Sequence, residues 1–279
     1  MFLYKGKKSQ LKASVGSLRA GKTVTWSSSD PGIAAVSSDG TVTAKSTGSA
    51  VITATASTTE NSMSAHCKVK VGPEKLVDIS KLTGAYQAQD YDVLTGKGNA
   101  DTHITVADGA AVTLRNCDIT AISNDTSHSW SGITLEGNGT ILLEGTNKVR
   151  GGFKNYSGIY VPEKKTLTIN GSGSLGVSSN GSGAGIGGGF NNKSCGNITI
   201  SGGDITATGG RFSAGIGSGY SNSSCKNINI TKGIIQVKAI KGEYADNSVG
   251  AGNSGSCGTI TIGGKVTDKI TQSPYYIHF

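Results

Sequence analysis

Branched apolar residues return about once every 30 positions through the C-terminal two thirds of the chain, and this repeat constrains the fold more than any other feature. They form three columns that keep nearly one period. The first comprises Val112/Leu114, Ile141/Leu143, Leu167/Ile169, Ile198/Ile200, Ile228/Ile230 and Ile260/Ile262. The second comprises Ile104, Ile133, Ile159, Ile186, Ile216 and Ala251, and the third Ile119, Val149, Leu175, Ile205, Ile235 and Val266.

A single repeat of this length cannot bury its apolar residues, but stacked repeats bury them against one another. Three strands per repeat predict a β-helix of triangular section, with coils about 4.8 Å apart and about six coils over roughly 30 Å. Ile169, Ile200 and Ile230 should therefore lie over one another. A β-propeller needs longer repeats of about 40 residues, and leucine-rich repeats need a helical arc that is absent here.

Glycine punctuates these short runs, with 43 Gly against only 4 Pro in 279 residues. The glycines alternate with Val, Ile, Leu and Thr in the manner of turns between strands. Because no long window has apolar residues at helical spacing, the fold should be all-β. Gly72-Pro73-Glu74 forms a short boundary, so we expect one domain over 1–72 and a second over 76–279.

The first domain has short alternating runs typical of a small β-sandwich. They are Leu11–Val15, Thr23–Ser27, Thr41–Ala44, Ala50–Thr55 and Cys67–Val71. The segment Trp26–Val36, the turn Asp39-Gly40 and the run Gly48–Ala54 resemble the bacterial immunoglobulin-like group-two family. That resemblance implies a spacer or adhesive module on a bacterial surface protein, with its opening strand missing and Trp26 in its core.

Gly183-Ala-Gly-Ile-Gly-Gly-Gly189 returns as Ser213–Gly219 and, more weakly, as Val249–Gly252. These runs resemble the repeats of Gram-positive surface proteins with a pectin-lyase-like, right-handed parallel β-helix. The resemblance covers about residues 104–264 and implies that architecture. It does not select a function, because the superfamily includes lyases, hydrolases, adhesins and plain binding modules.

The net charge of +8, with a pI near 9.2, would attract anionic partners. The lysines are scattered, however, and no Lys/Arg run or nucleic-acid motif occurs, so we expect no nucleic-acid partner. No apolar run approaches the roughly 18 residues of a membrane helix, so we expect no membrane insertion. We expect a monomer outside the cell or in the cell envelope of a bacterium, with any signal peptide lying outside this sequence.

The sequence has five cysteines, an odd number that argues against a closed disulfide framework. Cys195, Cys225 and Cys257 occupy one repeat position, and we expect them to form a column of buried thiols. No Cys-x-x-Cys pair or His-rich cluster has zinc spacing, so no metal site is expected.

Catalytic residues are not evident, and we expect a binding protein rather than an enzyme. Asp118 and Asp204 lie three repeats apart, too far to act on one sugar as a carboxylate pair does. No acidic cluster flanks the candidate bases Arg115, Arg150 and Arg211. No cofactor is expected. Calcium near Asp90, Asp92 and Asp101 stays an alternative, which no oxygen-ligand motif supports, beside a capping role for these residues.

Aromatic residues on the loops between columns are the candidate ligand-binding residues. Trp130 and Tyr156 each lie three residues before a second-column Ile, and Phe212 lies four before one. Phe190 and Tyr220 each lie five before a repeat Cys. Such rings could stack on sugars, with Lys154, Lys193 and Arg211 meeting anionic groups; alternatively, the rings cover loop backbone or stack on one another.

We therefore predict a secreted or cell-surface protein that binds carbohydrate or mediates adhesion through its β-helix. The expected partner is a polysaccharide or cell-surface glycan, anionic or neutral, and the immunoglobulin-like domain would serve as spacer. Two alternatives stay open: a polysaccharide lyase or hydrolase with an atypical site, and a purely structural stalk.

Overall fold

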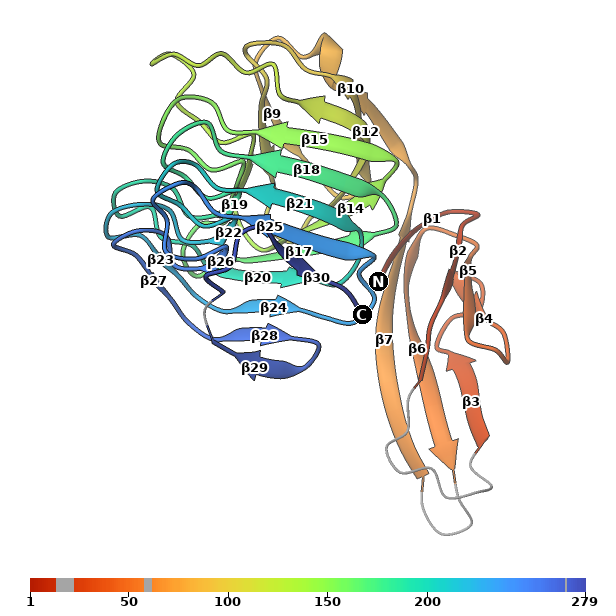
Figure 1. Cartoon of the computed structure of the whole chain (residues 1–279). Coiled ribbons are helices and arrows are strands. Elements are labelled where there is room, and N and C mark those ends of the chain that lie inside the picture. The colour runs from red at the N-terminus through yellow and green to blue at the C-terminus, as the bar shows by residue number, and fades with distance from the viewer. Residues whose placement is uncertain (14–22, 58–61, 269) are drawn as a thin grey trace. The chain divides into compact units, whose positions relative to one another are not determined.

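The computed structural model describes residues 1–13, 23–57, 62–268 and 270–279. The chain divides into two compact units, Met1–Lys75 and Leu76–Phe279. Nearly all regular structure is strand, which confirms the all-β prediction (Figure 1). Each unit has its own buried core, and the two are described separately below.

The first unit is a sandwich of two small sheets. One sheet has the order β1 (Phe2–Tyr4), β7 (Ser62–Gly72), β6 (Gly48–Ser57) and β3 (Thr23–Ser28). The other has the order β2 (Lys8–Gln10), β5 (Thr41–Ala44) and β4 (Ala34–Val36). Alternating residues of the strands point inward, as Val42, Ile52 and Val69 do, and each of these is at most 1% exposed. Trp26 packs against this core, as expected.

The start of the first unit differs from the sequence prediction. The first strand is β1, which pairs parallel to β7, and the sequence predicts no strand there. The next strand is β2, at Lys8–Gln10, whereas the sequence predicts a strand over Leu11–Val15. Leu11 to Ala13 are outside any strand, and residues 14–15 lie outside the described residues. Alternation over such a short polar run does not determine which residues pair.

The second unit is a β-helix of about five turns, in which each turn contributes parallel strands to the same sheet faces. One face carries β10 (Asp92–Lys97), β12 (Ala111–Ile119), β14 (Gly139–Glu144), β17 (Thr166–Gly171), β20 (Asn197–Ile200), β24 (Ile228–Ile230) and β28 (Ile260–Ile262). A second face carries β15 (Thr146–Arg150), β18 (Ser174–Ser178), β21 (Asp204–Thr208) and β25 (Gln236–Ile240), which Figure 1 shows as successive parallel arrows. Strand β12 is long enough to pair with both β14 and β15, so it belongs to both faces.

A third face carries shorter strands, which are β9 (Ala85–Ala88), β11 (His103–Val106), β13 (Ile133–Leu135), β16 (Ile159–Tyr160), β19 (Ile186–Gly187), β22 (Ile216–Gly217) and β26 (Val249–Gly250). A separate two-stranded sheet pairs β23 (Ser224–Cys225) with β27 (Ser256–Cys257). At the ends of the unit lie β8 (Lys75–Asp78), the short helix η1 (Ile79–Lys81), β29 (Lys265–Thr267) and β30 (Tyr275–Ile277).

The interior columns confirm the stacking prediction. Ile169 pairs in register with Ile200, and Ile200 with Ile230, and all three are fully buried. Branched side chains in parallel in-register strands fill the space above and below each other, which explains why each coil repeats the same residue types.

Five predicted column members occupy other positions. Leu167 pairs with Gly139 and not with Ile141, so the first column shifts by two residues at β17. In the second column Val249 takes the place predicted for Ala251. In the third, Leu175 pairs with Asn147 and not with Val149. Val237 takes the place of Ile235, which is 57% exposed.

The fifth is Val266, which is 74% exposed in the antiparallel strand β29. Each shift of two keeps the inward-facing parity of a strand. Periodicity alone therefore could not determine the register.

The prediction of a column of buried thiols is wrong. Cys195 and Cys225 form a disulfide between successive coils, with Cα atoms 4.4 Å apart. Cys257 lies outside this disulfide, and it is only partly buried. Stacking places the residues of neighbouring coils at the Cα separation that a disulfide needs, a geometry that residue counting could not show.

Glycines allow the close approach of coils on the third face. Gly187, Gly217 and Gly250 stack at one position with φ values of +134°, +137° and +130°. A Cβ on Gly217 would lie 1.9 Å from the backbone oxygen of Gly250. Glycine is therefore required at this position, where the backbones of neighbouring coils approach closely.

Candidate functional site

The strongest candidate site is a column of four aromatic rings on the loops of the β-helix, named here the aromatic ladder. Its members are Phe190, Tyr220, Phe212 and Tyr244. The ring centroids of successive members are 5.5, 4.6 and 5.3 Å apart, and their planes deviate by 25–28°. The 5.5 and 5.3 Å spacings join rings of successive coils and are close to the rise of one coil. The 4.6 Å spacing joins Phe212 and Tyr220, which flank the same strand, β22.

Two loop positions supply these rings. Phe190 and Tyr220 follow β19 and β22 in successive coils, and Phe212 and Tyr244 precede β22 and β26. Backbone hydrogen bonds hold the loops together, since the Asn191 amide donates to the Tyr220 carbonyl over 3.0 Å. The four rings therefore come as two pairs from two loop positions, and the pairs meet where Tyr220 stacks on Phe212.

The ladder lies outside the hydrophobic core. None of its rings belongs to the buried cluster of the β-helix or to the partly buried residues packed against that cluster. Three of the rings are half-buried, and Tyr244 is 44% exposed. The core is thus complete without the ladder, and the ladder forms a second apolar layer on the loops.

Cationic side chains lie over aromatic rings in this region. The Arg211 guanidinium carbon lies 4.7 Å from the centroid of the Tyr244 ring and 5.5 Å from that of Phe212. The Lys193 ammonium lies 3.8 Å from the centroid of Tyr156, and the Lys154 ammonium 5.3 Å from that of Phe153. Such contacts contribute about 0.5–1 kcal/mol at exposed sites.

Arg211 also has polar partners. It donates a 3.3 Å hydrogen bond to the Tyr244 hydroxyl, which raises the pKa of Arg211 above its usual value. Its Nε lies 3.8 Å from Glu243, and both side chains are largely exposed. Arg211 is therefore oriented along the ladder while its charge faces solvent.

Most of the predicted binding residues meet in this region. Three of them belong to the ladder, which are Phe190, Phe212 and Tyr220, and Arg211 lies over ladder rings. Tyr156 has the Lys193 ammonium over its ring.

Tyr244 was missed. A signal existed, because Tyr244 follows Phe212 by 32 residues, the same interval that separates the paired core residues Ile230 and Ile262.

Trp130 has a different environment from the ladder. Its ring packs against the core and stacks on His103 at 5.0 Å, and its indole nitrogen donates to the Thr102 carbonyl over 3.1 Å. His128 lies 5.1 Å from the same ring in a tilted arrangement. Trp130 thus anchors a loop of an early coil.

His128 bridges two carboxylates in that early coil. Its Nδ1 lies 2.6 Å from Asp125 and its Nε2 lies 3.0 Å from Asp101. Both contacts stabilise the imidazolium, so the pKa of His128 is raised, first by the hydrogen bond with Asp125. Burial lowers the pKa of the nearby His103.

Two of the acidic residues considered for catalysis or calcium accept local hydrogen bonds. Asp118 accepts from the backbone and hydroxyl of Thr120. Asp90 accepts a hydrogen bond from the Ala111 amide, which links the N-terminal end of the β-helix to its first coils. Within the described ranges, no group of three or more His, Cys, Asp or Glu side chains could hold a metal ion.

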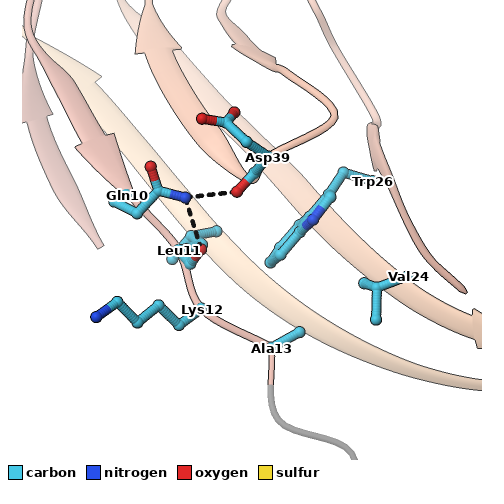
Figure 2. Close-up of a pocket in the computed structure, with 7 residues that line it drawn as sticks. All are labelled: Gln10, Leu11, Lys12, Ala13, Val24, Trp26 and Asp39. Atoms are coloured by element: carbon cyan, nitrogen blue, oxygen red, sulfur yellow. Dashed lines mark hydrogen bonds between the residues drawn. The ribbon is translucent and has the colours of Figure 1, made fainter.

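The first unit has a shallow hollow of about 330 Å³ beside Trp26 (Figure 2). Gln10 spans one side of it and donates to the carbonyls of Leu11 and Asp39. Its lining runs up to Ala13, next to residues outside the described ranges. We therefore assign no ligand to it.

Comparison with known proteins identifies both architectures. Residues 2–67 match the family model of the bacterial Ig-like domain (group 2), and residues 198–220 match that of a β-helix repeat. A search of curated proteins finds no match. Within the described residues, no helix is long and apolar enough to cross a membrane.

One similar solved structure is described as a bacterial Ig-like domain containing GH10 xylanase from termite gut. The sequences are 25% identical, the match covers 38% of this chain and 29% of that chain, and the TM-score is 0.23. This chain thus spans less than a third of the length of that xylanase structure.

These observations define an all-β protein that joins an immunoglobulin-like sandwich to a β-solenoid. Its N-terminal unit is a bacterial Ig-like domain of group two, and its second unit is a β-helix with β-helix repeats. Domains of this Ig-like family occur in extracellular or surface proteins of bacteria.

Proposed function

We propose that this protein binds carbohydrate at a bacterial surface or outside the cell, and that the ligand lies along the aromatic ladder. The Ig-like unit acts as a spacer. One observation carries the proposal: four stacked rings and an oriented arginine lie on loops outside a core that is already complete. Aromatic and cationic groups on a rigid scaffold suit sugars with anionic substituents.

The stacking decides which atoms a ligand can reach. Internal ring faces are covered by the next ring, so a sugar would contact ring edges, the hydroxyls of Tyr220 and Tyr244, and the cations. Phe190 and Tyr244, at the two ends of the ladder, each stack on one ladder ring, so no ladder ring covers their other face. The expected binding mode is a shallow strip along several coils, in contrast to a pocket enclosing one sugar.

Tyr244→Ala tests this proposal on the whole chain. We expect retention in affinity electrophoresis through immobilised glycans, chosen from a glycan array, to fall by about fivefold or more. Tyr276→Ala is the matched control, because Tyr276 is 45% exposed and also carries a cation, Lys238 at 5.3 Å. Equal retention of both folded variants and the wild type would reject the ladder as the site.

Tyr244→Phe refines this result. It retains the ring stack but removes the hydroxyl, so a hydroxyl contact with sugar predicts weaker retention without loss of loop packing. Assaying reducing ends and unsaturated products on the same glycans distinguishes binding from cleavage. Product formation that survives Tyr244→Ala would favour the enzyme alternative at a different site.

The structural-stalk alternative also has a supporting observation. Uncharged residues occupy one in-register row on the outer face of the first sheet, and they are Thr140, Thr168, Thr199, Asn229 and Thr261. A regular polar face is what a spacer would present to solvent. Absence of binding to all glycans of the array would favour this alternative.

A further inference from the structure

Three cysteines stand at one position in successive coils, but only two can share a disulfide at any time. Cys195 is bonded to Cys225, and the two residues form a parallel bridge. On the other side of Cys225, strands β23 and β27 pair Cys225 in register with Cys257, and Ser224 with Ser256. The middle cysteine therefore has a cysteine neighbour in the coil before it and in the coil after it.

We propose that Cys225 exchanges its disulfide partner between Cys195 and Cys257. In the forward step the Cys257 thiolate attacks the Sγ of Cys225, and a new Cys225–Cys257 bond forms. The Cys195–Cys225 bond breaks, and Cys195 leaves as thiolate and takes up the proton that Cys257 released. One disulfide and one thiol exist before and after, so the step needs no external oxidant or reductant.

The backbone geometry suits both pairings. Neighbouring strands lie about 4.8 Å apart, within the Cα separation of disulfides. Cys225 lies between Cys195 and Cys257 along the column, so the attacking and leaving residues lie in the coils on either side of it. The present disulfide joins residues 30 apart, and the alternative joins residues 32 apart, the difference between 225 and 257. Loop-closure entropy grows only logarithmically with length, so it scarcely distinguishes the two isomers.

The three cysteines of the column differ in how far they are buried. Cys195 is fully buried and Cys225 is 3% exposed, while Cys257 is partly exposed. The present isomer therefore keeps the thiol at the more accessible end of the column. In the alternative isomer a Cys195 thiol has an acceptor nearby, because its Sγ lies 3.5 Å from the Gly217 carbonyl oxygen.

The exchange moves a covalent link from one pair of loops to the next. In the present isomer the link follows Phe190 and Tyr220 by five residues each, so it fixes the loops of the first ladder pair. In the alternative isomer the Phe190 loop loses this link and the loop before Cys257 gains one. This consequence for ligand binding rests on the proposed function, but the exchange itself does not.

Disulfide mapping tests the proposal. The full chain is incubated without reductant at pH 8.5 for a day, quenched in acid, unfolded, and treated with N-ethylmaleimide at pH 6.5. Trypsin then places the three cysteines on the separate peptides 194–211, 212–226 and 242–265. We expect both linked pairs, 194–211 with 212–226 and 212–226 with 242–265, and maleimide on Cys195 as well as on Cys257.

Two variants make the test decisive. Cys257→Ser should abolish maleimide labelling of Cys195, and Cys195→Ser, refolded with oxidised glutathione, should form the Cys225–Cys257 link. Cys117, a buried thiol in an earlier coil, serves as the labelling control in every sample. Labelling of Cys257 but not of Cys195 in the wild type, with no Cys225–Cys257 link in Cys195→Ser, would overturn the proposal whether or not the ladder binds sugar.

Discussion

Truncating one member of the central core column tests the stacking directly. Ile200 is fully buried, with Ile169 and Ile230 paired in register on either side. Replacing a buried Ile by Ala costs about 2–5 kcal/mol, and more where the surroundings cannot collapse into the cavity. Here the hydrogen-bonded backbones of both adjacent coils keep their spacing, so we expect a loss of about 3–5 kcal/mol for Ile200→Ala.

Calorimetry of the whole chain measures this loss. For a unit of this size each kcal/mol shifts Tm by about 2–4 °C, so the β-helix transition should fall by roughly 6–20 °C. Thr199→Ala is the control on the outward face of the same strand, and it should change stability by no more than about 0.5 kcal/mol. Ile262→Ala, at a half-buried position in the last coil, should cost less than Ile200→Ala. Equal Tm shifts for Ile200→Ala and Thr199→Ala would refute the stacked-core reasoning.

Three further predictions concern other positions in the β-helix. Gly217→Ala should destabilise the β-helix by more than about 1 kcal/mol, because Gly217 has a positive φ and a carbonyl oxygen lies where the new Cβ would be. Gly176→Ala is the control, because the nearest atom to its new Cβ is 4.0 Å away. Thermal unfolding of the two variants compares them. The raised pKa of His128 means that its ion pairs contribute fully below about pH 6.5 and are lost as pH rises through the folded pKa. Asp101→Asn should lower that pKa in an NMR titration, and an unchanged pKa would contradict the pairing. Burial raises the pKa of Cys117 to about 12, so iodoacetamide at pH 8 should label it only after unfolding.

The sequence predicts the interior of the β-helix better than its register. Apolar residues recur because each coil must fill the same space, so the period and the buried face follow from residue type alone. Coil length varies with the loops, however, and a shift of two residues keeps the same side chains inward. That is why the predicted positions of Leu167 and Ala251 differ from the structure by two residues along the strand, while the stacking of Ile200 on Ile230 is predicted correctly.

Cysteine pairing and ring stacking depend on side-chain direction as well as spacing. The interval of 30 residues between Cys195 and Cys225 fits a thiol column and a disulfide equally well. Only the Cα separation and the direction of the Cβ atoms distinguish the two. Likewise, the sequence places Phe190 and Tyr220 on corresponding loops, but it does not show that Phe212 inserts beside Tyr220 from a different loop.

The ladder has two effects that must be separated before it is assigned to ligand binding. Three stacked pairs, at about 0.5–1.5 kcal/mol each beyond area burial, stabilise the loops by roughly 1.5–4.5 kcal/mol without any ligand. That contribution alone can explain why aromatic residues recur at these positions. It does not require Arg211 to be oriented by Tyr244 beside Glu243, since an exposed ion pair contributes little to folding. The proposed function therefore rests on the arginine more than on the rings, and it predicts a partner that carries negative charge.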